Sequence, residues 1–262
     1  MSNTATNLIQ TAYNEGDLSA GSLSALNKVA DLGNVIQQGL GIDPSLMPAS
    51  EVVLVSLLVD DSSSIRFGGN EQSMRDGFNG MKDSLEASKQ QDNIIVMTRF
   101  VNGKLHCSYV PLIDLEKLTV KNYQGNGGTP LYDETVKLLG TVIAKTKEFE
   151  NNGIQVRSIT LLATDGEDCG SNHSTASDVE KLIKEMLSKE KHIIAAMGFD
   201  NGQCDFKQVF TEMGIPDQWQ LTAASSASEI RKAFQVFSRS ATSASKSAAN
   251  FATASAGGFG TP

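Results

Sequence analysis

The chain has 262 residues, 40% of them hydrophobic and 20% charged, which is enough for one large α/β domain or two small ones. Its formal net charge of −8 argues against general binding to nucleic acids or anionic lipid, because both need a basic surface. The same charge is compatible with a site that collects divalent cations.

The cellular compartment follows from three features of the sequence. No apolar stretch approaches the roughly 20 residues of a membrane span. The N-terminus lacks the basic and apolar regions of a secretory signal. The three cysteines are an odd number at wide spacing, which does not indicate a disulfide framework. We therefore expect a cytoplasmic protein.

Residues 1–50 are predicted to form a helical arm. Ser22 is placed to cap a helix, and the following apolar residues recur at helical spacing: Leu23, Leu26, Val29, Ala30 and Val35. The segment 39–50, which contains Pro44, breaks this helix. We expect the arm to pack on the main domain, because a unit of this size would bury too little surface alone.

From residue 51 to 240, apolar strands alternate with helical patterns. Strands are predicted at 52–60, 93–101, 104–112, 157–165, 192–199 and 219–223. Helices are predicted at 71–89, 131–148, 176–190, 204–213 and from Ser228 onward. This alternation predicts an α/β domain with a Rossmann-like, doubly wound, mostly parallel six-stranded sheet flanked by helices.

Two parts of the chain depart from this repeat. The strand 104–112 follows the turn Asn102-Gly103, which is a hairpin signal, so it should lie antiparallel at the sheet edge. Residues 241–262 form a tail rich in Ser, Ala and Gly. We expect this tail to extend the last helix and to be disordered beyond about Ala256.

The end of the first strand carries the most informative polar residues. The nearly unbroken apolar run 52–59 is typical of a strand buried on both faces, and Asp60, Ser62 and Ser64 come just after it. Ligands of open α/β sheets bind at the carboxyl ends of such strands. Carboxylate and hydroxyl oxygens are hard donors that suit Mg²⁺, Mn²⁺ or Ca²⁺ rather than zinc or copper.

Two further loops should converge on the same edge of the sheet. In the segment 127–130, glycines allow a tight turn and Pro130 fits a first helical turn, so Thr129 presents its hydroxyl at a helix start. In the segment 164–166, Asp165 ends another apolar strand. We expect the two carboxylates and three hydroxyls to surround one divalent cation, with a coordination position left for an outside carboxylate.

The D-x-S-x-S, GGTP and TDG segments, in this order and spacing, resemble the metal-ion-dependent adhesion site of von Willebrand factor A (VWA) domains. The resemblance covers about residues 51–237. It implies that Mg²⁺, or alternatively Mn²⁺ or Ca²⁺, is bound by Asp60, Ser62, Ser64, Thr129 and Asp165. Family members commonly read D-x-S-G-S; Ser63 replaces that glycine here, which removes no ligand and bears on loop flexibility.

Several neighbours of these ligands are predicted to support the site or to form its rim. Asp61 could hydrogen-bond loop amides or contact solvent. Asp133, one turn into the helix after the threonine, is expected to give second-shell or helix-dipole support. Glu167 is expected at the solvated rim, and Gly128 and Gly166 adjoin two of the ligands. Cys169 and His173 fit no closed zinc pattern.

The resemblance implies a non-enzymatic interaction module in which the metal coordinates a Glu or Asp of a partner protein. Within the family, the chain is most similar to bacterial cytosolic members of the tellurium-resistance type, which suggests a stress or tellurium-resistance-type system. This similarity rests on the compact single domain, the GGTPLYD helix start and the Ser-rich tail.

Two alternatives stay open. The first is an Mg²⁺-dependent phosphoryl-transfer enzyme or receiver-like domain. Phosphatases of the haloacid-dehalogenase type want an aspartate where this chain has Ser62. These phosphatases and receiver domains both use a lysine at the end of a late strand, where this chain has Asp200. The second alternative is a self-assembling scaffold that forms homo-oligomers through the terminal extensions.

Overall fold

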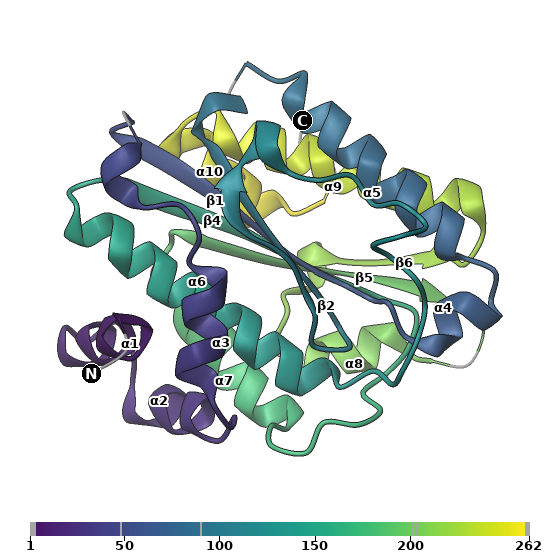
Figure 1. Ribbon diagram of the computed structural model, residues 1–262, viewed down its shortest axis with the longest axis horizontal. Helices are drawn as coiled ribbons and strands as arrows, with labels where there is room; N and C mark the ends of the chain where they lie inside the picture. The colour runs from purple at the N-terminus through teal and green to yellow at the C-terminus, as the bar shows by residue number, and fades with distance from the viewer. Residues whose placement is uncertain (1–3, 48, 90, 201, 203, 260–262) are drawn as a thin grey trace.

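The central feature of the computed structural model, which describes residues 4–47, 49–89, 91–200, 202 and 204–259, is a six-stranded sheet (Figure 1). Its strands run in the order β3-β2-β1-β4-β5-β6. They are β1 (Glu51–Val59), β2 (Ile94–Phe100), β3 (Leu105–Pro111), β4 (Gln155–Thr164), β5 (His192–Asp200) and β6 (Gln220–Ala224). Only the β2–β3 pair of this sheet is antiparallel. The fold class predicted from the sequence is therefore confirmed.

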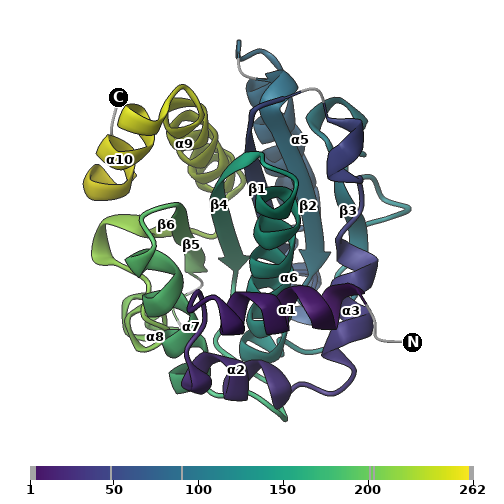
Figure 2. The same cartoon turned by 90° about the vertical axis from the view of Figure 1, so that its left-hand side faces the viewer.

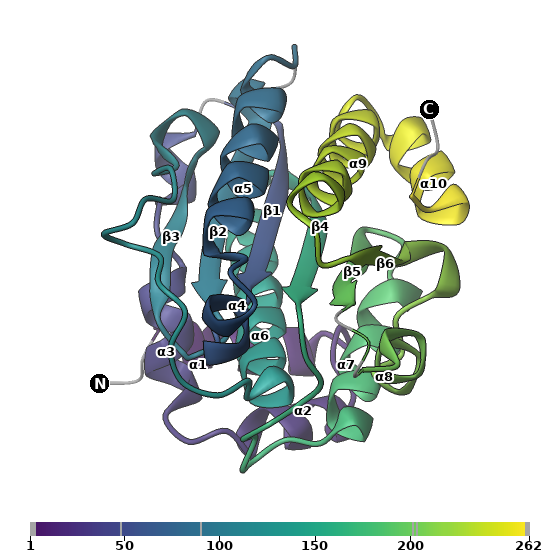
Figure 3. The same ribbon diagram turned by 90° about the vertical axis from the view of Figure 1, so that its right-hand side faces the viewer.

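Helices cover both faces of the sheet (Figures 2 and 3). One face carries α5 (Glu71–Glu86) beside α9 (Ala227–Ser245), and α10 (Ala248–Gly257) packs against α9. The other face carries α6 (Leu131–Asn151) and α7 (Ala176–Ser188), while α8 (Phe206–Glu212) contacts β5 and β6. No helix in the described part of the chain is long and apolar enough to cross a bilayer.

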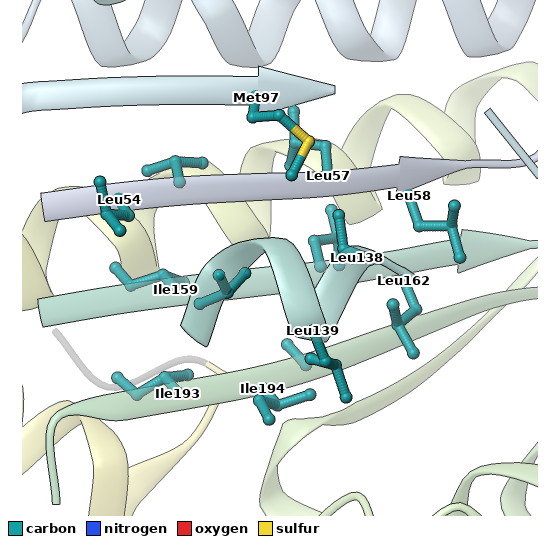
Figure 4. Packing of buried hydrophobic residues seen from close by; sticks show 14 of the residues in the cluster. Leu54, Leu57, Leu58, Met97, Leu138, Leu139, Ile159, Leu162, Ile193 and Ile194 are labelled. Atoms are coloured by element: carbon teal, nitrogen blue, oxygen red, sulfur yellow. The ribbon is translucent and has the colours of Figure 1, made fainter. Parts of the chain in front are cut away.

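The core explains why the central strands are nearly continuous apolar runs. Every residue of β1 after Glu51 is buried, because helices cover the strand on both faces. Leu138 and Leu139 of α6 pack over leucines of β1 and β4 such as Leu58 and Leu162 (Figure 4). Full burial of each such side chain stabilises the fold by about 1.5–3 kcal/mol.

The N-terminal segment contains three short helices instead of the single long helix predicted. These are α1 (Thr4–Asn14), α2 (Ala20–Asn27) and α3 (Leu32–Gly39), and they lie against α6 and α7 (Figure 2). The cap of α2 is Ser19, whose hydroxyl accepts a hydrogen bond from the amide of Ser22 inside the helix. The helix cannot continue past Asp31, because that residue has a left-handed backbone with φ of 57°.

The described part of the C-terminal tail is helical and packed. Helix α9 ends at Ser245, α10 follows, and Phe259 packs edge-on against Trp219 with ring centroids 5.1 Å apart. The amide of Phe259 also donates to the carbonyl of Gln218 at 2.9 Å. The disorder expected beyond about Ala256 is therefore not seen as far as Phe259, and residues 260–262 lie outside the described residues.

The direction in which the sheet grows reverses between β1 and β4. The connection after β1, through α4 (Ser63–Phe67) and α5, leads to β2 on one side, whereas the connection after β4, through α7, leads to β5 on the other. In open α/β sheets, such a switch point leaves a crevice at the carboxyl ends of the two strands. The loops that follow β1 and β4 are therefore the place to look for a site.

Candidate metal centre

Asp60, immediately after β1, joins the two loops at the switch point. Its side chain is completely buried. Oδ1 accepts a 2.7 Å hydrogen bond from the amide of Ser62, and Oδ2 accepts one of 2.7 Å from the hydroxyl of Thr164. The amide of Asp165 also donates to Oδ2, at 3.2 Å. The carboxylate of Asp60 thus fixes the relative position of the loops after β1 and β4.

A chain of hydroxyls runs from Ser62 to Asp165. The Ser64 hydroxyl donates to Oδ1 of Asp165 at 2.6 Å, and the hydroxyls of Ser62 and Ser64 are 2.8 Å apart. A hydroxyl has one hydrogen to give, so Ser62 is the donor to Ser64. Both serines are held in place by α4, which Ser62 precedes and which the fully buried Ile65 anchors in the core.

Thr129 reaches the same place from the loop before α6. Its amide donates to the carbonyl of Cys169 at 3.0 Å, and the amide of Cys169 donates back at 2.8 Å, which pins this loop to the one after β4. The amide of Ser63 donates to the carbonyl of Gly127 at 3.1 Å. Within the described ranges, the Thr129 hydroxyl has no hydrogen-bond partner, so it can serve as a ligand.

These loops enclose an open cavity of about 310 Å³. Of the five predicted ligands, four line it: Ser62, Ser64, Thr129 and Asp165. Asp60 is not part of the lining, since none of its surface is exposed. The predicted neighbours Gly128, Gly166 and Glu167 also line the cavity. The structure thus brings together in one cavity four of the five predicted ligands and three of their predicted neighbours.

Two cysteines line this cavity that sequence analysis did not place there. Cys169 is exposed, and Cys204 is half-buried in the segment after β5. Burial and the surrounding acidic groups raise the pKa of the Cys204 thiol to about 11, so it is a neutral thiol at physiological pH. Cys204 follows β5, a third strand that ends at the same edge of the sheet, and this position in the sequence could have located it.

Three aspartates, Asp60, Asp61 and Asp165, lie close enough together at the site to affect one another's charge. Burial, together with the charge of Asp60, raises the pKa of Asp165 to about 6, against the opposing hydrogen bond from Ser64. Burial raises the pKa of Asp61 to about 7, opposed by the amide of Asn102 and reinforced by Asp60. In the part of the chain that the structure describes, none of these aspartates forms an ion pair. A bound cation would relieve this repulsion.

Asp61 and Asp133 support the loops rather than line the cavity. Oδ1 of Asp61 accepts a 3.0 Å hydrogen bond from the amide of Asn102, in the turn between β2 and β3. The Asp133 carboxylate accepts hydrogen bonds from three consecutive amides, those of Asn172 (2.9 Å), His173 (3.2 Å) and Ser174 (2.7 Å). Burial alone would raise the pKa of Asp133, but these hydrogen bonds hold it below its usual value.

A further residue, Tyr123, supports the site in a way that the sequence did not indicate. Its ring is fully buried, and its hydroxyl donates to the backbone carbonyl of Asp60. The ring also packs edge-on against Phe100, with centroids 5.4 Å apart. The residue therefore ties the loop before α6 to the end of β1 from beneath the cavity.

The residues present fit a hard divalent cation by their chemistry. Across the described residues, no group of three or more His, Cys, Asp or Glu side chains is placed to hold a metal ion. A cation in this cavity would be held by the Asp165 carboxylate and the hydroxyls that line it, with the buried charge of Asp60 next to them, and water would fill the remaining positions. That donor set suits Mg²⁺ or Mn²⁺, which keep several waters when bound to proteins.

No protein family matches the sequence of this chain, and no curated protein matches it. Solved structures, in contrast, are similar to this chain in fold. The pilus adhesin SpaC from Lactobacillus rhamnosus GG, in an open conformation, is similar with a TM-score of 0.53 and 14% identity over 74% of this chain and 30% of SpaC. Proximal thread matrix protein 1 from the mussel byssus has a TM-score of 0.47 and 18% identity over 74% of this chain and 47% of its own.

The VWA domain of SpRpn10 has a TM-score of 0.46 and 12% identity over 69% of this chain and 93% of that domain. Only the likeness to SpaC exceeds a TM-score of 0.5 among these three, and at such low identity it supports the fold alone. The chain spans less than half the length of the adhesin and of the mussel protein.

Proposed function

We propose that this chain is a VWA-type, non-enzymatic interaction module that binds Mg²⁺ or Mn²⁺ and presents it to a carboxylate of a partner protein. The observation that carries the proposal is the cavity in which Ser62, Ser64, Thr129 and Asp165 meet above the buried Asp60. The resemblance of the same segments to the adhesion site of VWA domains supports it. A bacterial stress system of the tellurium-resistance type is the setting that this resemblance favours.

Each residue has a distinct task in this proposal. Asp60 and Asp165 supply the negative charge that balances a divalent cation. The hydroxyls of Ser62, Ser64 and Thr129 supply neutral oxygens, and Thr129 has no competing hydrogen bond among the described residues. The bound metal acts as a Lewis acid toward an incoming carboxylate. Because the cavity is open to solvent, a Glu or Asp side chain of another protein can enter it.

The same geometry favours binding over phosphoryl transfer. The nucleophile of such an enzyme would be Asp60, but this carboxylate has no exposed surface and both of its oxygens already accept hydrogen bonds. Phosphoryl transfer also needs cationic groups that stabilise the transferred phosphoryl group. In the described segments, neither Asp60 nor Asp165 has a lysine or arginine as an ion-pair partner.

The test is a titration with Mn²⁺, whose free concentration is measured by electron paramagnetic resonance. We expect wild-type protein to bind one Mn²⁺ per chain and excess Mg²⁺ to displace it. Asp60→Asn and Asp165→Asn should each weaken binding at least about tenfold, because each removes one of the two negative charges that balance the cation, Asp165 in the cavity wall and Asp60 buried beneath it. Asp92→Asn is the matched control, since this exposed aspartate precedes β2 at the opposite edge of the sheet. Equal binding by wild type and Asp165→Asn would contradict the proposal.

A further inference from the structure

The helix that carries the serines of the metal centre also carries an exposed aromatic residue. Phe67 ends α4 and is 86% exposed, more than any other large hydrophobic residue in the described part of the chain. Its helix is anchored by the buried Ile65, so the backbone that presents the ring is held in place. Phe, like Tyr and Trp, is enriched in protein–protein interfaces relative to the rest of protein surfaces.

A second cavity, of about 240 Å³, adjoins this helix. It is lined by Arg66, Glu71, Arg75, Val120 and Gln124, and Val120 is 60% exposed. Two of the charged groups already have partners. Arg75 donates to the carbonyl of Tyr123 at 3.1 Å, and Glu71 accepts from the amide of Gly125 at 2.7 Å. Arg66 makes no ion pair or hydrogen bond through its side chain to any described residue, so its charge is available to a partner.

The two cavities share one wall, formed by α4 and the loop 120–129. On the helix, Ser64 lines the metal cavity and Arg66 lines the second one. On the loop, Gly127 lines the first and Val120 the second. The loop packs directly on the helix, since a Cβ atom added at Gly125 would lie 2.8 Å from the Cβ of Arg66. A segment bound at the metal therefore passes next to the second cavity.

We propose that Arg66, Phe67 and Val120 form a second contact region that recognises an acidic segment of another protein with an apolar residue near its metal-binding carboxylate. The proposal rests on the proposed function and specifies its partner. Along α4, Phe67 lies about 5 Å from Ser64. An extended segment advances about 3.3 Å per residue, so the apolar residue should lie about one or two positions from the carboxylate.

Charge complementarity determines the kind of occupant. A divalent cation and Arg66 both favour acidic side chains of the partner. Phe67 and Val120 favour an apolar side chain of the partner, near those acidic ones. A second copy of this chain is a poorer partner, because two molecules that each carry a net charge of −8 repel each other. The occupant is therefore a segment of a different protein.

The experiment uses a random peptide library displayed on phage, selected on wild-type protein in Mg²⁺. We expect the enriched peptides to share an Asp or Glu with an aromatic or aliphatic residue about one or two positions away. The affinity of one enriched peptide is then measured by fluorescence polarisation. Phe67→Ser and Arg66→Ala should each weaken it about tenfold, while Mn²⁺ affinity stays at the wild-type value.

Matched controls separate this region from general surface effects. Ile113→Ser removes another hydrophobic residue, 70% exposed, and Lys207→Ala removes another exposed cation; both should leave peptide affinity unchanged. Enriched peptides without the acidic and apolar pair would overturn the proposal. So would wild-type peptide affinity in Phe67→Ser and Arg66→Ala, or self-association of the wild type that Phe67→Ser abolishes.

The two proposals fail in different ways. If Asp165→Asn abolishes Mn²⁺ and peptide binding while Phe67→Ser changes neither, the metal-dependent function stands and the second contact region is overturned. If the wild type binds no Mn²⁺, the proposed function is overturned. In that case, peptide binding in chelator that still depends on Phe67 and Arg66 would support the contact region without the metal.

Discussion

The hydroxyl of Ser64 donates to Oδ1 of Asp165 at 2.6 Å, across 101 positions of the sequence. This hydrogen bond joins the helix after β1 to the loop after β4. It also orients the Asp165 carboxylate at the wall of the cavity. The candidate metal centre therefore depends on the packing of two strands that are adjacent in the sheet but distant in the chain.

Ser64→Ala should weaken Mn²⁺ binding about tenfold, which corresponds to about 1.4 kcal/mol. The substitution removes a neutral oxygen from the cavity and releases Asp165 from its hydrogen bond. Ser63→Ala is the matched control, because Ser63 contributes its backbone amide to Gly127 and its hydroxyl does not line the cavity. Isothermal titration calorimetry with both variants measures the difference. Equal affinity of the two variants would remove Ser64 from the ligand set.

Asp133→Ala should lower the free energy of unfolding by about 2–4 kcal/mol, because three backbone amides of the loop after β4 lose a charged acceptor. Metal affinity should fall as well, since the same loop begins with Asp165. Asn172→Ala is the control: it keeps the backbone amide that Asp133 accepts from, and it should change stability by less than about 0.5 kcal/mol. Urea unfolding followed by circular dichroism checks both values. Similar unfolding midpoints for Asp133→Ala and Asn172→Ala would contradict the role of Asp133 in anchoring the loop after β4.

Two glycines on α5 should respond oppositely to alanine. A Cβ atom at Gly77 would lie 2.4 Å from Cδ2 of Phe234 on α9, whose ring is buried and stacked with Phe199. Gly77→Ala should therefore destabilise the protein by about 1–3 kcal/mol. A Cβ at Gly80 meets nothing within 4 Å, so Gly80→Ala should stabilise it by about 1 kcal/mol through helix propensity. Thermal melts of the two variants should shift in opposite directions; shifts of the same sign would refute this packing.

His192 should make the protein sensitive to mild acid. Burial, with the nearby charge of Lys191, lowers the pKa of His192 to about 3, and its Nδ1 lies 2.7 Å from the hydroxyl of Ser158. Between about pH 6.5, the pKa of an unfolded histidine, and pH 3, the unfolded chain binds a proton that the folded chain does not. The free energy of unfolding therefore falls by up to about 1.4 kcal/mol for each pH unit as the pH decreases through this range.

The variant His192→Asn should remove this contribution from the slope of unfolding free energy against pH. His173→Asn, at an exposed position, is the matched substitution for comparison. The measurement is urea unfolding at a series of pH values between 4 and 7. Parallel curves for wild type and His192→Asn would show that His192 does not titrate with unfolding.

The sequence was most informative where local physics decides the structure. The run 52–59 is apolar because both faces of β1 are covered, and the turn Asn102-Gly103 marks the hairpin that makes β3 antiparallel. For the same reason, Asp60 and Asp165 could be placed at strand ends and Thr129 at a helix start. These features depend on residues that are neighbours in the chain, so strand, turn and cap preferences reveal them.

The sequence was less informative where distant segments decide the outcome. The arm breaks at Asp31 because α2 and α3 each pack on a different part of the main domain, and Phe259 is ordered because Trp219 lies next to it. Helical spacing predicts neither result. The role of Tyr123 beneath Asp60 also depends on contacts between segments 63 positions apart.

By itself, the sequence determined the α/β class, the antiparallel edge strand and the identity of the five candidate ligands, because short-range preferences encode all three. Only the tertiary structure decided that four of those ligands share one cavity with Cys204, that Asp60 lies buried beneath them, and that Phe67 is exposed on the helix that carries Ser64. The physical reason is the strand order. It sets β1 next to β4 at the switch point, and pairing between strands more than 90 positions apart leaves no local signal in the chain.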